Sequence, residues 1–124
     1  MIEIQPASPV RAIVVAPPSK SYTNRALIVA ALADGESFIQ NPLFSDDTKY
    51  MSRALGQFGV AVDRRDNEFR TLGRNGKMRA PRDEIYVGNA GTAMRFLTTF
   101  AALADGETRL TGDDRMRERP IEDL

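Results

Sequence analysis

The hydrophobic residues of this chain follow strand-like and helix-like patterns that alternate along the sequence. Residues 11–16 are rich in β-branched side chains and predict a strand, which the two following prolines end. Residues 22–33 then carry apolar side chains on every side, which predicts a helix that is buried all round. Gly35 is a typical residue to end such a helix, and residues 36–40 predict a short strand.

The next stretch predicts a helix with one apolar face, followed by a hairpin. Ser45 is a suitable helix cap, and residues 46–58 place apolar side chains at i, i+3, i+4 and i+7. These side chains are Met51, Ala54, Leu55 and Phe58. A single stripe of this kind indicates a helix whose other faces meet solvent. Residues 60–64 and 68–72 alternate and predict a β-hairpin, whereas residues 73–83 predict a loop.

The first pattern then returns, which indicates an internal duplication. Residues 85–87 predict a strand, residues 88–92 a turn, and residues 93–104 a second helix that is apolar on most sides. The seven residues Ala-Ala-Leu-Ala-Asp-Gly-Glu at 30–36 recur unchanged at 101–107. Each unit is expected to run strand, buried helix, strand, exposed helix and hairpin.

The second unit is expected to be cut short. Residues 120–124 predict the first turn of its exposed helix, with proline at the favoured first position. We therefore expect a fragment of a longer protein, with one unit at about 21–80 and a truncated second unit at 81–124.

Composition narrows the function classes. The 124 residues include 17 basic and 17 acidic residues, which argues against a general nucleic-acid or membrane-surface binder. The chain has no cysteine and no histidine, which excludes thiolate nucleophiles and Cys-type zinc sites; we expect no metal and no cofactor. No signal-peptide pattern or membrane-length apolar run is present, so a cytoplasmic protein is expected.

One candidate for chemistry is the polar stretch at residues 17–25. Lys20, Ser21 and Arg25 stand where a helix begins, and unpaired amides and the helix dipole favour an anion there. A serine that merely caps the helix, with solvated Lys20 and Arg25, fits the spacing equally well. Taken alone, the turn at 88–91 is better interpreted as an ordinary turn. The duplication, however, gives it the position equivalent to the Lys20 turn, so that two helix N-termini could face one cleft.

A third candidate is the arginine-rich stretch at residues 115–120. A run of charges is normally a solvated surface, yet at least one of its arginines could turn into the cleft. The acidic pair Asp46 and Asp47 is best interpreted as part of a helix N-terminus, with a smaller expectation that one carboxylate reaches the site.

Together these motifs resemble the N-terminal part of the 5-enolpyruvylshikimate-3-phosphate synthase family. They occur in the order and spacing typical of that family, at residues 19–21, 24–27, 45–47, 88–95 and 117–121. The sister family acting on UDP-N-acetylglucosamine is a weaker alternative, because it has Lys-Asn where this chain has Lys20-Ser21. A free-standing anion-binding or structural repeat module is the alternative outside enzymes.

The resemblance implies an α/β fold of repeated βαβαββ units, of the inside-out barrel type. The family has two domains with the active site between them. Residues 1–20 would provide strands and a crossover belonging to the other domain, and residues 21–124 an incomplete substrate-binding domain. The remaining C-terminal part would supply the acid–base residues, so that this chain alone should be inactive. A monomer is expected.

The resemblance also implies the substrates and their ligands. The family transfers the enolpyruvyl group of phosphoenolpyruvate to the 5-hydroxyl of shikimate 3-phosphate and releases phosphate, without a metal. The implied ligands of shikimate 3-phosphate are Lys20, Ser21 and Arg25. Those of phosphoenolpyruvate are Lys20, Gly91 and Arg119. Residues expected to line or support the site are Asp47, Asn89, Thr92 and Arg95.

Two residues depart from the family's pattern beside these motifs. Pro18 stands where many members have glycine before Ser-Lys-Ser, and Phe96 stands where many have proline after Met-Arg. Phe96 directly follows the segment that is implied to bind phosphoenolpyruvate.

Overall fold

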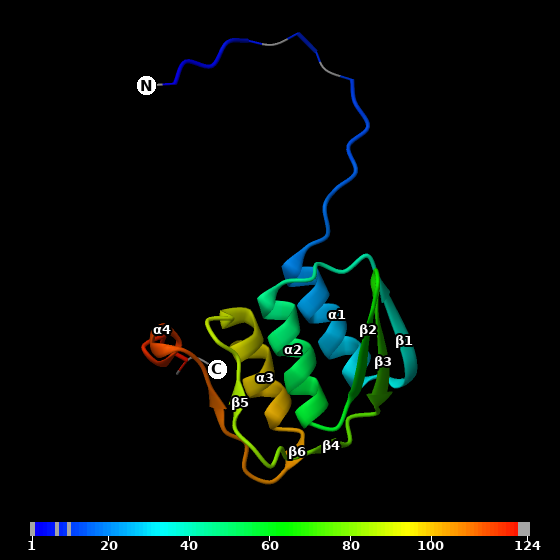
Figure 1. Cartoon of the computed structure of the whole chain (residues 1–124), viewed down its shortest axis with the longest axis vertical. Helices are drawn as coiled ribbons and strands as arrows, with labels where there is room; N and C mark the ends of the chain where they lie inside the picture. The colour runs from blue at the N-terminus through cyan, green and yellow to red at the C-terminus, as the bar shows by residue number, and fades with distance from the viewer. Residues whose placement is uncertain (1, 7, 10, 122–124) are drawn as a thin grey trace.

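The fold is a mixed α/β arrangement in which helices pack against one face of a small sheet (Figure 1). The structure, a computed structural model, describes residues 2–6, 8–9 and 11–121. The helices α1 (Lys20–Leu32), α2 (Asp46–Gln57) and α3 (Gly91–Ala101) lie side by side and run in the same direction. Their N-termini therefore gather at one end of the molecule.

The sheet is antiparallel, with strand order β1-β3-β2. Its strands are β1 (Asp34–Gln40), β2 (Ala61–Arg65) and β3 (Glu68–Arg74). Phe69 and Thr71 of β3 are buried on the face of the sheet that meets the helices. The predicted strand at 36–40, the predicted helix at 46–58 and the predicted hairpin are thus confirmed.

Short parallel pairs join the rest of the chain to this body. The strand β5 (Ile85–Tyr86) pairs with β7 (Leu110–Thr111), and β4 (Met78–Arg79) pairs with β6 (Ala104–Asp105). A single helical turn, α4 (Asp114–Arg117), follows β7. Two of these elements correct the sequence prediction: β4 lies in the predicted loop, and β6 begins where the helix at 93–104 was expected to continue.

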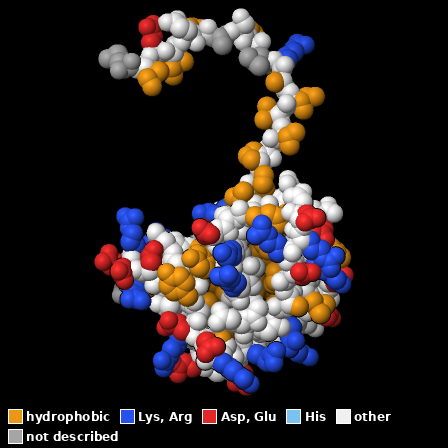
Figure 2. All heavy atoms as spheres, in the orientation of Figure 1, with side chains coloured by type: hydrophobic (Ala, Val, Ile, Leu, Met, Phe, Trp, Pro, Cys, Tyr) orange, Lys and Arg blue, Asp and Glu red, His pale blue; other side chains and the backbone are white. Residues whose placement is uncertain are grey.

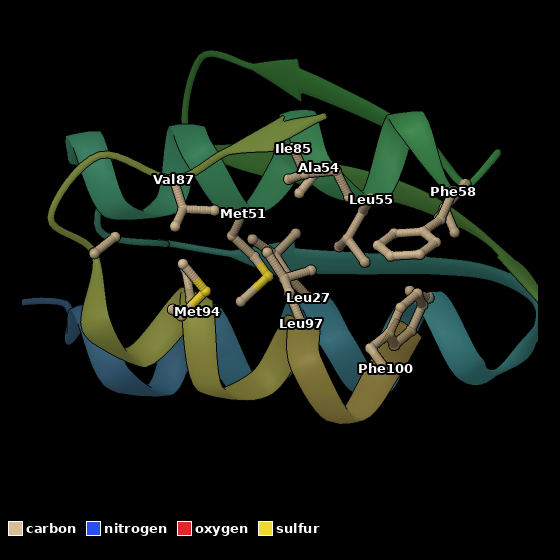
Figure 3. Packing of buried hydrophobic residues seen from close by; sticks show 14 of the residues in the cluster. Leu27, Met51, Ala54, Leu55, Phe58, Ile85, Val87, Met94, Leu97 and Phe100 are labelled. Atoms are coloured by element: carbon tan, nitrogen blue, oxygen red, sulfur yellow. The ribbon is translucent and has the colours of Figure 1, made fainter. Parts of the chain in front are cut away.

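The helices meet in one hydrophobic core, shown in Figure 3. Leu27 of α1, Met51 of α2 and Leu97 of α3 point toward one another and are fully buried. Near the C-terminal ends of α2 and α3, the rings of Phe58 and Phe100 meet edge to face, with centroids 5.1 Å apart. The apolar stripe predicted for residues 46–58 is the face of α2 that enters this core.

The predicted strand at residues 11–16 is absent from the described part of the chain, where residues 11–19 contain no strand. Ile13, Val14 and Val15 are 99%, 82% and 86% exposed. Figure 2 shows these hydrophobic residues along a segment that stands away from the body. The physical reason is the lack of a neighbouring strand, because a β-strand is stable only when its backbone groups are paired.

The prediction that the first helix is buried all round is also wrong. Leu27 and Ala31 are buried, but Tyr22 is 77% and Val29 67% exposed. The sheet and the other helices cover only part of the helix, which leaves an apolar face of α1 in solvent. The helix expected from Pro120 lies largely outside the described residues, and Pro120 and Ile121 themselves are not helical.

None of the helices in the described ranges is long and apolar enough to span a membrane.

The packing of the core predicts different losses of stability for two substitutions on the same helix, α1. Leu27→Ala should lower the free energy of unfolding by about 2–5 kcal/mol, because it removes buried methyl groups and leaves a cavity. Val29→Ala, only two residues away but exposed, should change it by less than about 0.5 kcal/mol. Urea unfolding of both variants tests this. Equal losses would contradict the packing described here.

Candidate functional site

The candidate site lies where the N-termini of the parallel helices meet. Ser19 caps α1 by accepting a hydrogen bond from the Tyr22 amide at 3.4 Å. Ser45 caps α2 through the Thr48 amide in a capping box. The first residue of α3 is Gly91, and no side chain among the described residues caps this helix. Because helix N-termini carry unpaired N–H groups and partial positive charge, this end of the molecule favours an anion.

Lys20 links the first two of these helix ends. It is the first residue of α1, and its Nζ lies 3.1 Å from Oδ2 of Asp47, in the first turn of α2. Both side chains remain partly exposed. The ion pair therefore orders the lysine at the site and leaves it accessible to a ligand.

Arg25 links α1 to α3. Its guanidinium donates a hydrogen bond to the Ser21 carbonyl oxygen at 3.2 Å. The guanidinium carbon also lies 5.5 Å from the ring centroid of Phe96, on α3. The side chain thus folds back along α1 toward Ser21, so the predicted group of Lys20, Ser21 and Arg25 stands at one helix start.

The hydroxyl of Thr23 joins the start of α1 to the segment before α2. Its hydroxyl donates to the Ser19 carbonyl and accepts from the Leu43 amide, both at 2.9 Å. The neighbouring Asn24 is fully buried, and its side-chain amide has no hydrogen-bond partner in the part of the chain that the structure describes. The sequence offered the Thr23 hydroxyl as a possible donor to an anion, but in the structure the backbone occupies it, and Asn24 was expected only as part of the motif at 24–27.

The second group of predicted residues meets at the start of α3. Gly91 and Arg119 are in direct contact: a Cβ atom at Gly91 would lie only 2.5 Å from a guanidinium nitrogen of Arg119. Arg95, one turn into α3, donates to the Pro120 carbonyl at 3.4 Å. A cavity of about 370 Å³ opens between these residues and Met116.

A close approach of two glycines positions Arg119. A Cβ atom at Gly112 would lie 2.2 Å from the carbonyl oxygen of Gly88, and the Asp113 amide donates to that same oxygen at 3.1 Å. Asp113 also caps α4 by accepting from the Met116 amide at 2.9 Å. The turn at 88–91 and the arginine-rich turn are therefore held in contact by backbone atoms. Sequence reasoning missed Gly112, although a glycine before a capping aspartate is a signal for such a turn.

The remaining predicted residues are Asn89 and Thr92. Asn89 is exposed, and its carbonyl accepts from the Gly91 amide; Thr92 is half-buried in the first turn of α3. Lys20 begins α1 and Arg119 follows α4 at the same end of the molecule, and no contact between them is found among the described residues. Within the same residues, no group of three or more acidic side chains could hold a metal ion.

Comparisons with known proteins show which family this chain resembles. A family model described as EPSP synthase (3-phosphoshikimate 1-carboxyvinyltransferase) matches residues 4–124. The 3-phosphoshikimate 1-carboxyvinyltransferase of Methanospirillum hungatei is 53% identical over 106 residues, which cover 86% of this chain and 25% of that protein. The protein of the same name from Rhizobium etli is 47% identical over 118 residues, covering 95% and 28%.

A solved structure gives the same result for the fold. The EPSP synthase from Acinetobacter baumannii superposes with a TM-score of 0.82 at 27% identity, over 88% of this chain and 25% of that one. The chain thus spans about a quarter of the length of the relatives that it matches.

The glycine contact predicts opposite outcomes for two glycine-to-alanine substitutions. Gly112→Ala should lower the free energy of unfolding by about 1–3 kcal/mol, because its methyl group would overlap the Gly88 carbonyl. Gly56→Ala, in α2 with open space around it, should leave stability unchanged or slightly raised. Thermal unfolding of the two variants is the measurement. A neutral Gly112→Ala would show that the two turns do not touch.

Proposed function

The chain belongs to the EPSP synthase family, and we therefore propose that it provides the N-terminal part of an enolpyruvyl transferase active site. The reaction adds the 5-hydroxyl of shikimate 3-phosphate to phosphoenolpyruvate, through a tetrahedral intermediate that then loses phosphate. Both substrates are anions, and the chain gathers lysine, arginine and helix N-termini at one end. The observation that carries the proposal is the contact of Arg119 with Gly91, two residues far apart in sequence, at a helix start that no described side chain caps.

We assign the phosphate of shikimate 3-phosphate to the start of α1. Ser21 can donate its hydroxyl, Arg25 presents a planar fork for two oxyanion contacts, and Lys20 contributes a compact positive charge. The pairing with Asp47 holds Lys20 over the helix ends before substrate arrives. A bound dianion would compete with that carboxylate for the ammonium group, so Asp47 acts here as a positioning residue.

We assign phosphoenolpyruvate to the start of α3. The missing side chain at Gly91 lets an anion approach the backbone amides closely. Arg119 stands over this position and can pair with a carboxylate or phosphate. Arg95 holds the neighbouring Pro120 carbonyl, while Asn89 and Thr92 line the turn. Lys20 is the group that would touch both substrates and compensate the charge that develops between them.

The surfaces left open support a larger assembly around this chain. The apolar residues of 11–16 and the exposed face of α1, including Tyr22 and Val29, are of the kind that proteins normally cover. We propose that 21–124 forms two βαβαββ units of one domain, the second incomplete, and that 1–20 crosses to the other domain. The rest of the enzyme, in the same cytoplasmic polypeptide, would then supply the acid–base residues.

A chimaeric enzyme tests the proposal. It joins residues 1–124 to the part of the Methanospirillum hungatei protein that follows its match to this chain, with that intact protein as the positive control. The chimaeric enzyme should release phosphate only when phosphoenolpyruvate and shikimate 3-phosphate are both present. An inert chimaera beside an active control would contradict the proposal.

The same assay predicts the effect of removing the shared charge. Lys20→Ala in the chimaeric enzyme should lower kcat/KM by about 100-fold or more, because a positioned charge is lost from a site for two anions. The matched control is Lys77→Ala, an exposed lysine in the turn between β3 and β4, which should leave kcat/KM unchanged. Equal effects of the two substitutions would remove Lys20 from the site.

A further inference from the structure

We propose that Phe96 is a positioning residue for Arg25 and thereby sets the affinity for shikimate 3-phosphate. This inference rests on the proposed function. The observation behind it is the guanidinium of Arg25 over the Phe96 ring, at 5.5 Å from the carbon to the ring centroid. A cation in this position is attracted by the negative face of the ring.

The two partners differ in burial. Phe96 is half-buried and packs against the hydrophobic core. Arg25 is exposed, and apart from the ring the contact that holds its guanidinium is the hydrogen bond to the Ser21 carbonyl at 3.2 Å. The ring is therefore the fixed element and the arginine is the group being held.

The direction in which Arg25 is held matters for binding. The carbonyl of Ser21 and the ring of Phe96 together keep the guanidinium beside Ser21, the other proposed phosphate ligand. A free arginine side chain loses much rotamer entropy when it binds, and a side chain that is already ordered loses less. Phe96 therefore strengthens phosphate binding without touching the phosphate.

The effect should be confined to one substrate. On α3 the neighbouring residue Arg95 points to the Pro120 carbonyl, on the Arg119 side, whereas Phe96 points to α1. Phosphoenolpyruvate is assigned to Gly91 and Arg119, neither of which depends on the ring.

Replacement of the ring in the chimaeric enzyme tests the proposal. Phe96→Leu keeps an apolar side chain without a π-face, and should raise the Kd for shikimate 3-phosphate roughly two- to fivefold, the range for an exposed cation–π contact. The KM for phosphoenolpyruvate and kcat should stay the same. Phe96→Tyr retains the ring and should restore the original Kd.

Two controls separate positioning from a general loss of structure. Phe44→Leu removes the ring under Arg64, whose guanidinium carbon lies 4.0 Å from the ring centroid in a second cation–π pair of the described residues. It should lower stability without changing either substrate constant. In an Arg25→Gln background, Phe96→Leu should have no further effect on the Kd for shikimate 3-phosphate, because the residue that it positions is gone.

The outcomes distinguish the inference from the function on which it rests. An active chimaeric enzyme in which Phe96→Leu leaves the Kd unchanged, or shifts both substrate constants equally, would overturn the role of Phe96 alone. A persistent effect of Phe96→Leu in the Arg25→Gln background would do the same. An inert chimaeric enzyme beside an active control would overturn the proposed function and this inference together.

Discussion

The parallel packing of α1, α2 and α3 brings the residues of the proposed site together. Leu27, Met51 and Leu97 are fully buried where these helices meet, and this contact fixes the relative heights of the helices. Because all three run in the same direction, their N-termini come together at one end, and the partial positive charge of each adds to that of the others. Side chains placed near these helix starts therefore share one surface. A hydrophobic contact in the middle of the molecule thus determines the electrostatics at its end.

The two halves of the proposed site are connected through α3. Its first residue, Gly91, meets Arg119, while Arg95 and Phe96 reach in different directions, to the Pro120 carbonyl and to Arg25. The close approach of Gly112 to Gly88 adds a backbone contact that holds the arginine-rich turn beside the start of this helix. A displacement of α3 would therefore disturb both groups of residues at once. The arrangement explains how ligands that stand far apart in the sequence can be ordered before substrate binds.

Much of this could be predicted from the sequence, for identifiable reasons. The apolar stripe on α2 repeats at helical spacing, so the helix could be predicted from the sequence; its members are Met51, Ala54, Leu55 and Phe58. The hairpin could be predicted from its alternating residues. The predictions of a strand at 11–16 and of all-round burial for the first helix were wrong. The composition of a segment cannot say whether a partner strand or a covering helix is present. The contact of Gly112 with Gly88 and that of Phe96 with Arg25 depend on the angle between elements, which no local pattern specifies.

We propose that the start of α1 is a phosphate site whose ligands are ordered before substrate binds. A crystal structure of the chimaeric enzyme with shikimate 3-phosphate alone is the test. The phosphate is expected within hydrogen-bonding distance, about 3 Å, of the Ser21 hydroxyl, the Arg25 guanidinium and the Lys20 ammonium group. Arg25 is expected to lie over the Phe96 ring still. A phosphate bound away from the N-terminus of α1, or an Arg25 turned away from both Ser21 and Phe96, would contradict it.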